Sequence, residues 1–278
     1  MPQTIFLNSA NRLRNGWWIA IFLAMLTALL LPLIVLADRG DGRVPLYQQL
    51  GIILVASLLC QAMRRASVAE LLGALDFRWL RELSFGLVLG ALLMIVPAAF
   101  LLLIGAVSWQ VNPDAWAVLP ATLALLLTAA AAEELLFRGF MFQRLVAGLG
   151  AWPAQLAMAA LFTLTHADAL GTLGDHGFLA GANIFFASLL FGLAFLRTGS
   201  LALPIGIHFA ANAVQGPLLG FGVSGGDAPG LLVATTQHAS SWLTGGEFGL
   251  EASAPGFVSV VALIAIVWRL PRPGRKTA

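Results

Sequence analysis

Two adjacent glutamates stand inside an apolar stretch that could otherwise cross a membrane. Glu133 and Glu134 follow an apolar run that begins at Trp116, and Arg138 comes four residues after Glu134. Residues four apart share a helix face, so Glu134 and Arg138 are spaced as an acid–base pair. Glu133 is rotated by about 100° from its neighbour, which leaves its carboxylate for other chemistry. Because ionisable groups inside a membrane are costly, we expect them to face a cavity or a partner.

Two further polar groups interrupt later apolar runs. His166 ends one run, and His208 and Asn212 lie four residues apart within another. We estimate depth by counting residues from the predicted inner turns near 149–150 and 197–199, at about 1.5 Å per helical residue. Glu133 and His166 then lie about 25 Å from their turn, and His208 lies about 15 Å from its turn. On position alone the glutamates could simply mark the inner end of a span. These depths are broadly similar, which favours one site that three helices share.

These residue types suit two kinds of hydrolytic chemistry. A carboxylate beside a histidine suits the activation of water, with Glu133 as the general base. The second histidine, His208, and the amide of Asn212 suit the stabilisation of an oxyanion. Alternatively, Glu133, His166 and His208 could supply three ligands to a divalent metal such as Zn²⁺, with a fourth position open to water. A nucleophilic triad has no clear candidate, because no Ser or Thr is spaced as a partner for either histidine.

The composition shows what kind of protein must position these groups. The chain has 278 residues, of which 59% are hydrophobic and 10% are charged. A soluble domain carries about 25% charged residues, so an ordinary soluble enzyme, a disordered chain and a nucleic-acid binder are excluded. The single cysteine, Cys60, excludes an intrachain disulfide. The sequence predicts a protein that crosses the membrane several times.

Apolar runs predict an all-α transmembrane bundle of about eight helices, formed by one domain that comprises residues 1–278. A span needs about 20 mostly apolar residues. Residues 66–81 are too polar to span, and Ser67 and Glu70 form a capping box, so we expect a short amphipathic helix at the inner interface. The outer loop 217–255 is rich in Gly and Ser, and the last helix covers about 256–270. The eight runs are 17–37, 46–63, 83–107, 117–145, 152–167, 178–196, 199–216 and 256–270.

The basic residues predict the orientation. With the N-terminus in the cytoplasm, only Arg39 and Arg43 fall outside and Arg138 within a span, while all other Lys and Arg fall inside. Both termini are therefore expected in the cytoplasm, in the inner membrane if the host is bacterial. The first apolar run exceeds the length of a signal-peptide core, which favours a retained first span.

Three motifs, in this order, resemble those of the CPBP family of intramembrane proteases. This family includes CAAX prenyl endopeptidases and bacteriocin-processing or immunity proteins. The residues from Glu133 to Arg138 are similar to its EExxxR motif, those from Phe162 to His166 to its FxxxH motif, and those from His208 to Asn212 to its HxxxN motif. The resemblance covers about residues 115–216. The stretch 244–251 is similar to a glycine-rich segment that often precedes the last helix of bacterial members.

The resemblance implies an endopeptidase that acts on a membrane-associated or prenylated, CAAX-like substrate, with a site below the membrane surface that opens to the cytoplasm. Its partners are then a peptide or protein substrate and the lipid bilayer. The implied roles are activation of water for Glu133 and His166, oxyanion stabilisation for His208 and Asn212, and support of the motif for Glu134 and Arg138.

Three questions stay open at this point. The family is catalogued as metal-dependent, yet a metal-free glutamate mechanism is proposed for its eukaryotic-type members. A proton-coupled transporter could use Glu133 and His166 as a relay, although no internal repeat is visible in the sequence. A non-catalytic immunity or binding protein could use the same fold.

Overall fold

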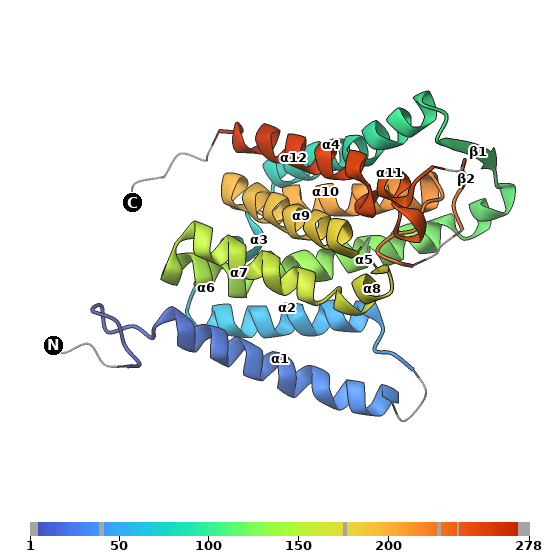
Figure 1. Cartoon of the computed structure of the whole chain (residues 1–278). Helices are drawn as coiled ribbons and strands as arrows, with labels where there is room; N and C mark the ends of the chain where they lie inside the picture. Colours follow the sequence, from blue (N-terminus) through green and yellow to red (C-terminus); the bar gives the residue numbers. More distant parts are fainter. Residues whose placement is uncertain (1–4, 39–41, 175–176, 227–228, 238, 272–278) are drawn as a thin grey trace.

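The chain folds into a bundle of helices that lie along one long axis (Figure 1). A computed structural model describes residues 5–38, 42–174, 177–226, 229–237 and 239–271. The described part of the chain begins and ends at the same end of the bundle, and a small two-stranded sheet lies at the other. The elements are α1 (Asn15–Asp38), α2 (Leu46–Met63), α3 (Val68–Leu72), α4 (Phe77–Leu103), β1 (Val107–Val111), α5 (Leu119–Arg138), α6 (Phe140–Leu149), α7 (Ala151–Leu164), α8 (Ala167–Gly171), α9 (Gly177–Thr198), α10 (Ala202–Ala213), β2 (Leu232–Thr236), α11 (Ser241–Thr244) and α12 (Ala254–Trp268), with short 3₁₀ turns at 113–117, 246–248 and 250–252 and a π-helical turn at Val214–Leu218.

Five helical segments of the described residues are long and apolar enough to cross a membrane: Asn15–Asp38, Leu46–Met63, Val68–Leu103, Leu119–Leu149 and Gly177–Thr198. All eight predicted runs coincide with helices, so the predicted helical membrane bundle is confirmed in its general form. The count of eight spans is not confirmed, because α7, α10 and α12 have only 14, 12 and 15 residues. At 1.5 Å per residue, each is shorter than the roughly 30 Å hydrocarbon core of a bilayer.

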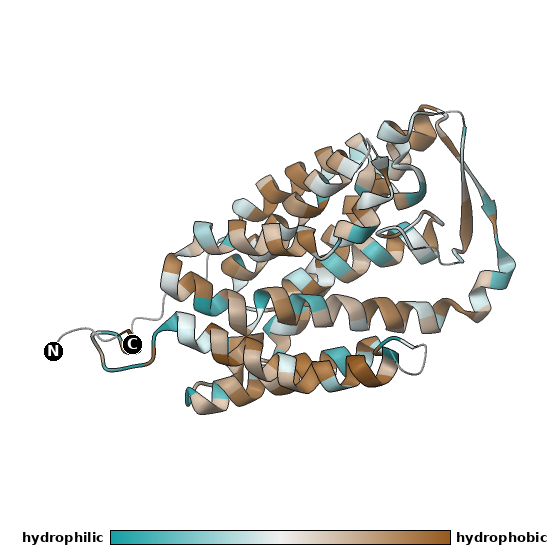
Figure 2. Ribbon diagram, turned by 60° about the horizontal axis from the view of Figure 1, so that its bottom comes forward, coloured by the Kyte–Doolittle hydropathy of each residue, from teal (hydrophilic) through white to brown (hydrophobic). Residues whose placement is uncertain are grey.

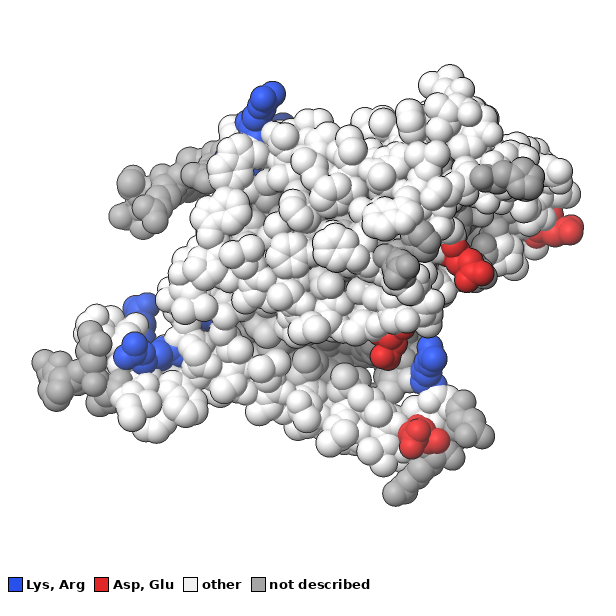
Figure 3. Space-filling view, viewed as in Figure 1, with Lys and Arg blue, Asp and Glu red and all other residues white. Residues whose placement is uncertain are grey.

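The surface of the bundle has the character of a membrane protein. Large apolar side chains point outward, for example Leu103, which is 85% exposed, and Phe178, which is 81% exposed. Apolar residues run along the helices, and polar ones gather toward the ends (Figure 2). On the face drawn in Figure 3, Lys and Arg gather at the end where α1 begins and α12 ends, whereas Asp and Glu gather at the opposite end, where there is also some basic surface. The long sides of the bundle are therefore suited to lipid.

Two predicted segments are interrupted by glycines. Ser67 caps α3 by accepting the backbone N–H of Glu70 as expected, but the helix predicted over 66–81 is not continuous. It stops at Gly73, whose φ of +87° favours glycine, and α4 starts after Asp76. In the predicted run 117–145, α5 ends at Arg138 and α6 starts at Phe140, on either side of Gly139.

The predicted outer loop 217–255 has structure of its own. Its strand β2 pairs antiparallel with β1, with Val107 opposite Thr236. The preceding π-helical turn prolongs α10, and the side chain of Gln215 on this turn accepts the backbone N–H of Glu251 at 3.2 Å. The predicted span 83–107 extends too far along the chain, because α4 ends at Leu103 and Val107 lies in β1. The loop folds back against the bundle.

Helices α4 and α10 meet through glycines, as the GxxxG spacing of Gly86 and Gly90 predicts. A Cβ atom at Gly86 would lie 2.5 Å from the carbonyl oxygen of Leu203, and one at Gly206 would lie 2.5 Å from that of Leu83. A Cβ at Gly90 would collide with the carbonyl of Ile207. The backbones touch here, and this contact fixes the position of the helix that carries His208.

Candidate active site

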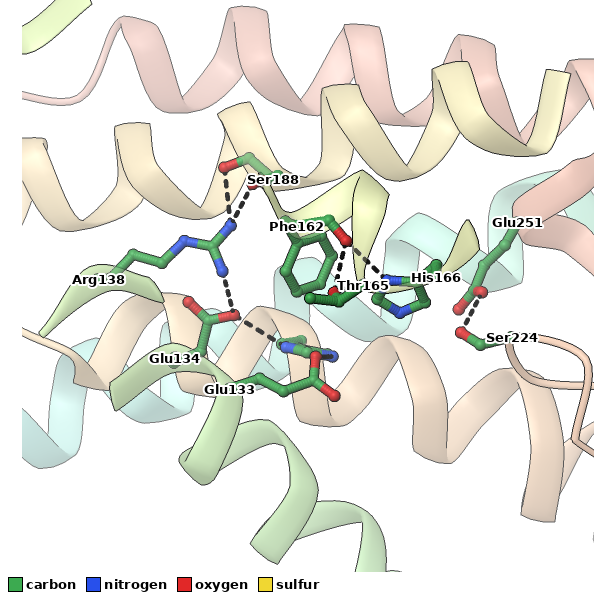
Figure 4. A network of polar contacts seen from close by, with 10 residues as sticks. Glu133, Glu134, Arg138, Phe162, Thr165, His166, Ser188, Ser224 and Glu251 are labelled. Atoms are coloured by element: carbon green, nitrogen blue, oxygen red, sulfur yellow. Dashed lines mark hydrogen bonds and ion pairs between the residues drawn. The ribbon is translucent and has the colours of Figure 1, made fainter. Parts of the chain in front are cut away.

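A buried ion pair anchors the acidic end of α5. The Glu134 side chain is fully buried, and its Oε1 accepts a hydrogen bond from Arg138 Nη1 at 3.1 Å. Arg138 also donates to Ser188 of α9, to the hydroxyl at 2.7 Å and to the carbonyl oxygen at 3.0 Å (Figure 4). Its guanidinium lies 5.0 Å from the ring centre of Phe162, which adds a cation–π contact. The charge of Glu134 is thus compensated inside the bundle, and α5 is tied to α9.

The same carboxylate orients His208 of α10. Nδ1 of His208 lies 2.9 Å from Oε1 of Glu134, and the ring stacks on Phe191 with the centroids 4.8 Å apart. Because a carboxylate accepts hydrogen bonds, Nδ1 carries the proton that makes this contact. Nε2 then points the other way, to 3.8 Å from Oε2 of Glu133.

Glu133 differs from its neighbour in exposure. Its side chain is 37% exposed, whereas that of Glu134 is 0% exposed. Among the described residues, its closest charged partner is His208 at 3.8 Å, which is too long for a hydrogen bond. The carboxylate of Glu133 is therefore free to hold a water molecule or a substrate group.

His166 lies just after the end of α7. Its Nδ1 lies 2.9 Å from the carbonyl oxygen of Phe162, so this nitrogen donates and Nε2 is left unprotonated in the neutral ring. Thr165 Oγ1 lies 3.4 Å from the same Nδ1, a contact that the sequence spacing did not predict. Since this hydroxyl donates to Phe162 at 2.7 Å, it is not placed as a nucleophile.

One cavity of about 170 Å³ brings the predicted site residues together: Glu133, His166, His208 and Asn212 all line it. Most of its other walls are apolar and come from α4, α7, α9, α10 and α12, for example Met94, Ile184 and Val260. Polar groups in a small apolar cavity interact strongly, because little water screens them.

Two polar residues from the loop before α12, Ser224 and Glu251, also line this cavity, and the sequence did not single them out as site residues. Ser224 donates its hydroxyl hydrogen to Oε2 of Glu251 at 2.9 Å (Figure 4). Burial raises the pKa of Glu251, while the Ser224 hydrogen bond and the nearby His166 and His208 act in the opposite direction. The available signal was the position of Glu251, which ends the glycine-rich stretch 244–251.

The predicted metal ligands do not converge as a divalent ion requires. Protein ligands bind Zn²⁺ at about 2.0–2.3 Å from one shared centre. Within the described ranges, no three His, Cys, Asp or Glu side chains are arranged to hold a metal ion. With Nδ1 of His208 bonded to Glu134 and Nδ1 of His166 bonded to a carbonyl oxygen, only Nε2 of each ring is left to bind a metal. The donor set of Glu133, His166 and His208 therefore does not fit a metal in this arrangement.

Apolar helices that enclose a cavity with two glutamates and two histidines define a membrane protein with a polar site among its helices. Residues 115–214 match the family model described as "Rce1-like: Type II CAAX prenyl endopeptidase Rce1-like". This match confirms the resemblance to the CPBP family and supports an intramembrane endopeptidase. The matched range contains all three motifs and ends before Ser224 and Glu251. Neither the curated proteins nor the solved structures gave a match.

Proposed function

We propose that this protein is an intramembrane endopeptidase that hydrolyses a peptide bond of a membrane-associated, CAAX-like substrate with an activated water molecule. One observation carries the proposal: the free carboxylate of Glu133 shares an apolar cavity with the two histidines and Asn212. The matching family supplies the substrate class, a C-terminal prenylated CAAX sequence.

Glu133 and His166 activate the water. Both offer an acceptor to the cavity, a carboxylate oxygen and an unprotonated Nε2. Glu133 takes a proton from water as the hydroxide oxygen attacks the carbonyl carbon. The observation that favours Glu133 over Glu134 is that Glu134 is already bonded to both Arg138 and His208.

His208 and Asn212 stabilise the oxyanion that forms on the carbonyl oxygen. With its Nδ1–H donated to Glu134, His208 can donate to an oxyanion only when Nε2 also carries a proton. The carboxylates of Glu133 and Glu134 on either side of the ring favour this cationic form. Arg138 and Glu134 are positioning residues, because they hold the ring in place without facing the substrate.

We propose an integral membrane location with both termini in the cytoplasm, in the inner membrane of a bacterial host. The cluster of basic residues at the end of the bundle where α1 begins and α12 ends supports this orientation (Figure 3).

Cleavage by the purified full-length protein in lipid nanodiscs tests the proposal. A farnesylated CAAX peptide and the same peptide without lipid are incubated with wild type, Glu133→Gln and Glu247→Gln, and the products are identified by mass spectrometry. Glu247 is an exposed acid of the same loop region and serves as the control. We expect wild type and Glu247→Gln to cleave the peptide and Glu133→Gln to be slower by about 10²–10⁴-fold. Equal rates for wild type and Glu133→Gln would remove Glu133 as the base, and proton-dependent flux through vesicles without any cleavage would favour a transporter.

A further inference from the structure

Glu251 enters the cavity from outside the three motifs. It lies on the short turn before α12, and two contacts fix it there: its backbone N–H donates to Gln215, and its Oε2 accepts from Ser224. Gln215 in turn donates to the carbonyl oxygen of Gly222 at 2.7 Å. These bonds tie the turn at Glu251 to the end of α10 and to the loop that carries Ser224.

The carboxylate lies among the groups of the proposed active site. In Figure 4, His166 lies between Glu133 and Glu251, and all three line one cavity. His208 lines the same cavity, so both histidines share it with Glu251. A carboxylate that only held the loop together would not need to reach this cavity, because Gln215 already holds the turn.

Two carboxylates in different surroundings can divide the work of an acid and a base. Glu133 lies on α5, partly exposed and close to His208. Glu251 is half-buried, and the loss of water around its carboxyl raises its pKa, which favours the protonated acid. Hydrolysis of a peptide bond needs such an acid, because an amine leaves with a proton and not as a bare amide anion.

We propose, on the basis of the proposed function, that Glu251 is a further catalytic residue that donates a proton to the nitrogen of the leaving group. Glu133 accepts one proton of water, and the water oxygen bonds to the carbonyl carbon. When the C–N bond breaks, its electron pair stays on the nitrogen, which takes the proton of the Glu251 carboxylic acid. Glu133 is then protonated and Glu251 ionised, and a proton passes between them through water to restore the starting state.

A comparison of leaving groups tests this role. The substrate is the farnesylated CAAX peptide whose scissile bond has been located by mass spectrometry, together with the analogue in which an ester oxygen replaces the scissile N–H. An alkoxide leaves far more readily than an amide anion, so the ester depends much less on an acid. We expect Glu251→Gln to slow cleavage of the peptide by about 10²–10⁴-fold but cleavage of the ester by less than about threefold. Glu251→Asp should restore part of the peptide activity, and Glu247→Gln should cleave both substrates as wild type does.

Other outcomes overturn the inference. If Glu251→Gln slows both substrates equally while its melting temperature is that of wild type, Glu251 orients the site and donates no proton to nitrogen. If Glu251→Gln cleaves the peptide at the wild-type rate while Glu133→Gln is inactive, Glu133 carries out both proton transfers. The proposed role of Glu251 is then wrong, and the proposal of an endopeptidase is kept. If Glu133→Gln equals wild type, the proposed function itself fails. Should Glu251→Gln not fold, Ser224→Ala is compared in its place, with a smaller loss on the peptide expected and none on the ester.

Discussion

Glu134 Oε1 contacts Nδ1 of His208 at 2.9 Å, although 74 residues separate the two in the sequence. The same oxygen binds Arg138, so one buried carboxylate fixes both an arginine and a histidine. This arrangement gives the two adjacent glutamates different tasks. In the proposed mechanism, Glu134 holds the site together and Glu133 reacts.

Glu133→Gln and Glu134→Gln should therefore differ in stability. Removing one partner of a buried ion pair costs about 3–5 kcal/mol, whereas changes at exposed positions stay within about 0.5 kcal/mol. We expect a large drop in melting temperature for Glu134→Gln and almost none for Glu133→Gln, while both lose activity. Thermal unfolding of the two variants in the same detergent measures the difference. Equal melting temperatures would mean that Glu134 is not a structural anchor.

The contact between α4 and α10 predicts a second stability effect. A Cβ at Gly90 would collide with the carbonyl of Ile207, one residue before His208. Overpacking of this kind costs about 1–3 kcal/mol, so Gly90→Ala should lower both the melting temperature and the cleavage rate. Gly51→Ala is the matched control, because no atom lies within 4 Å of a Cβ at this position of α2. A Gly90→Ala protein as stable and active as Gly51→Ala would contradict the close contact.

The raised pKa of Glu251 predicts how stability changes with pH. Because the folded protein binds this proton more tightly than the unfolded chain, stability falls as pH rises from the ordinary glutamate pKa through the raised one. The Glu251→Gln variant has no ionisable group at this position, so its stability should fall less than that of wild type over the same pH range. Glu133, His166, His208 and Ser224 share the cavity and remain in both proteins, so the difference reports the ionisation of Glu251 together with its coupling to the two histidines. Melting temperatures of the two proteins from about pH 4.5 to pH 8 give the comparison, and parallel curves would show that Glu251 ionises normally.

Removal of metal should leave activity intact. Within the described ranges, no three donors converge on a metal position, and the proposed reaction uses the protein's own groups. We expect purified wild type to cleave the peptide at an unchanged rate after treatment with a chelator. The metal content of the same sample is measured to show that the chelator has removed any bound ion. A loss of activity on chelation that Zn²⁺ restores would show that the site rearranges around an ion.

Single-cysteine labelling checks the orientation. Cys60 is fully buried and can be replaced by Ala, and Arg65 and Glu247 are exposed positions for new cysteines. A maleimide that cannot cross membranes should label Glu247→Cys on intact cells but Arg65→Cys only after the cells are opened. The opposite pattern would invert the proposed topology.

Local spacing predicted the parts of the site that depend on one helix. The pairing of Glu134 with Arg138 and the cap at Ser67 follow from residues three or four apart. The break at Gly139 was missed, because the apolar run continues on both sides of it. The pairing of Val107 with Thr236 was also missed, because a short apolar run has no period that separates strand from helix.

Glu251 was beyond prediction for a different reason. Its place depends on the path of the loop, which follows from the π-helical turn after α10 and from the bonds of Gln215. The contact between Gln215 and Glu251 joins residues that are 36 positions apart in the sequence, and no periodic pattern in the sequence predicts it. The glycine-rich stretch indicated a special backbone there, but not which cavity it would enter.

The loop wall of the cavity has a consequence for relatives of this protein. The residues of the three motifs lie within 115–214, whereas Ser224 and Glu251 come from the segment that follows. Two proteins could thus keep identical motifs and still hold different substrates, if only the later segment has diverged. A chain shortened after Leu218 would keep every motif and lose one side of its binding site. Under the proposed function, the motifs supply the chemistry of cleavage, and the segment that follows them shapes the selectivity.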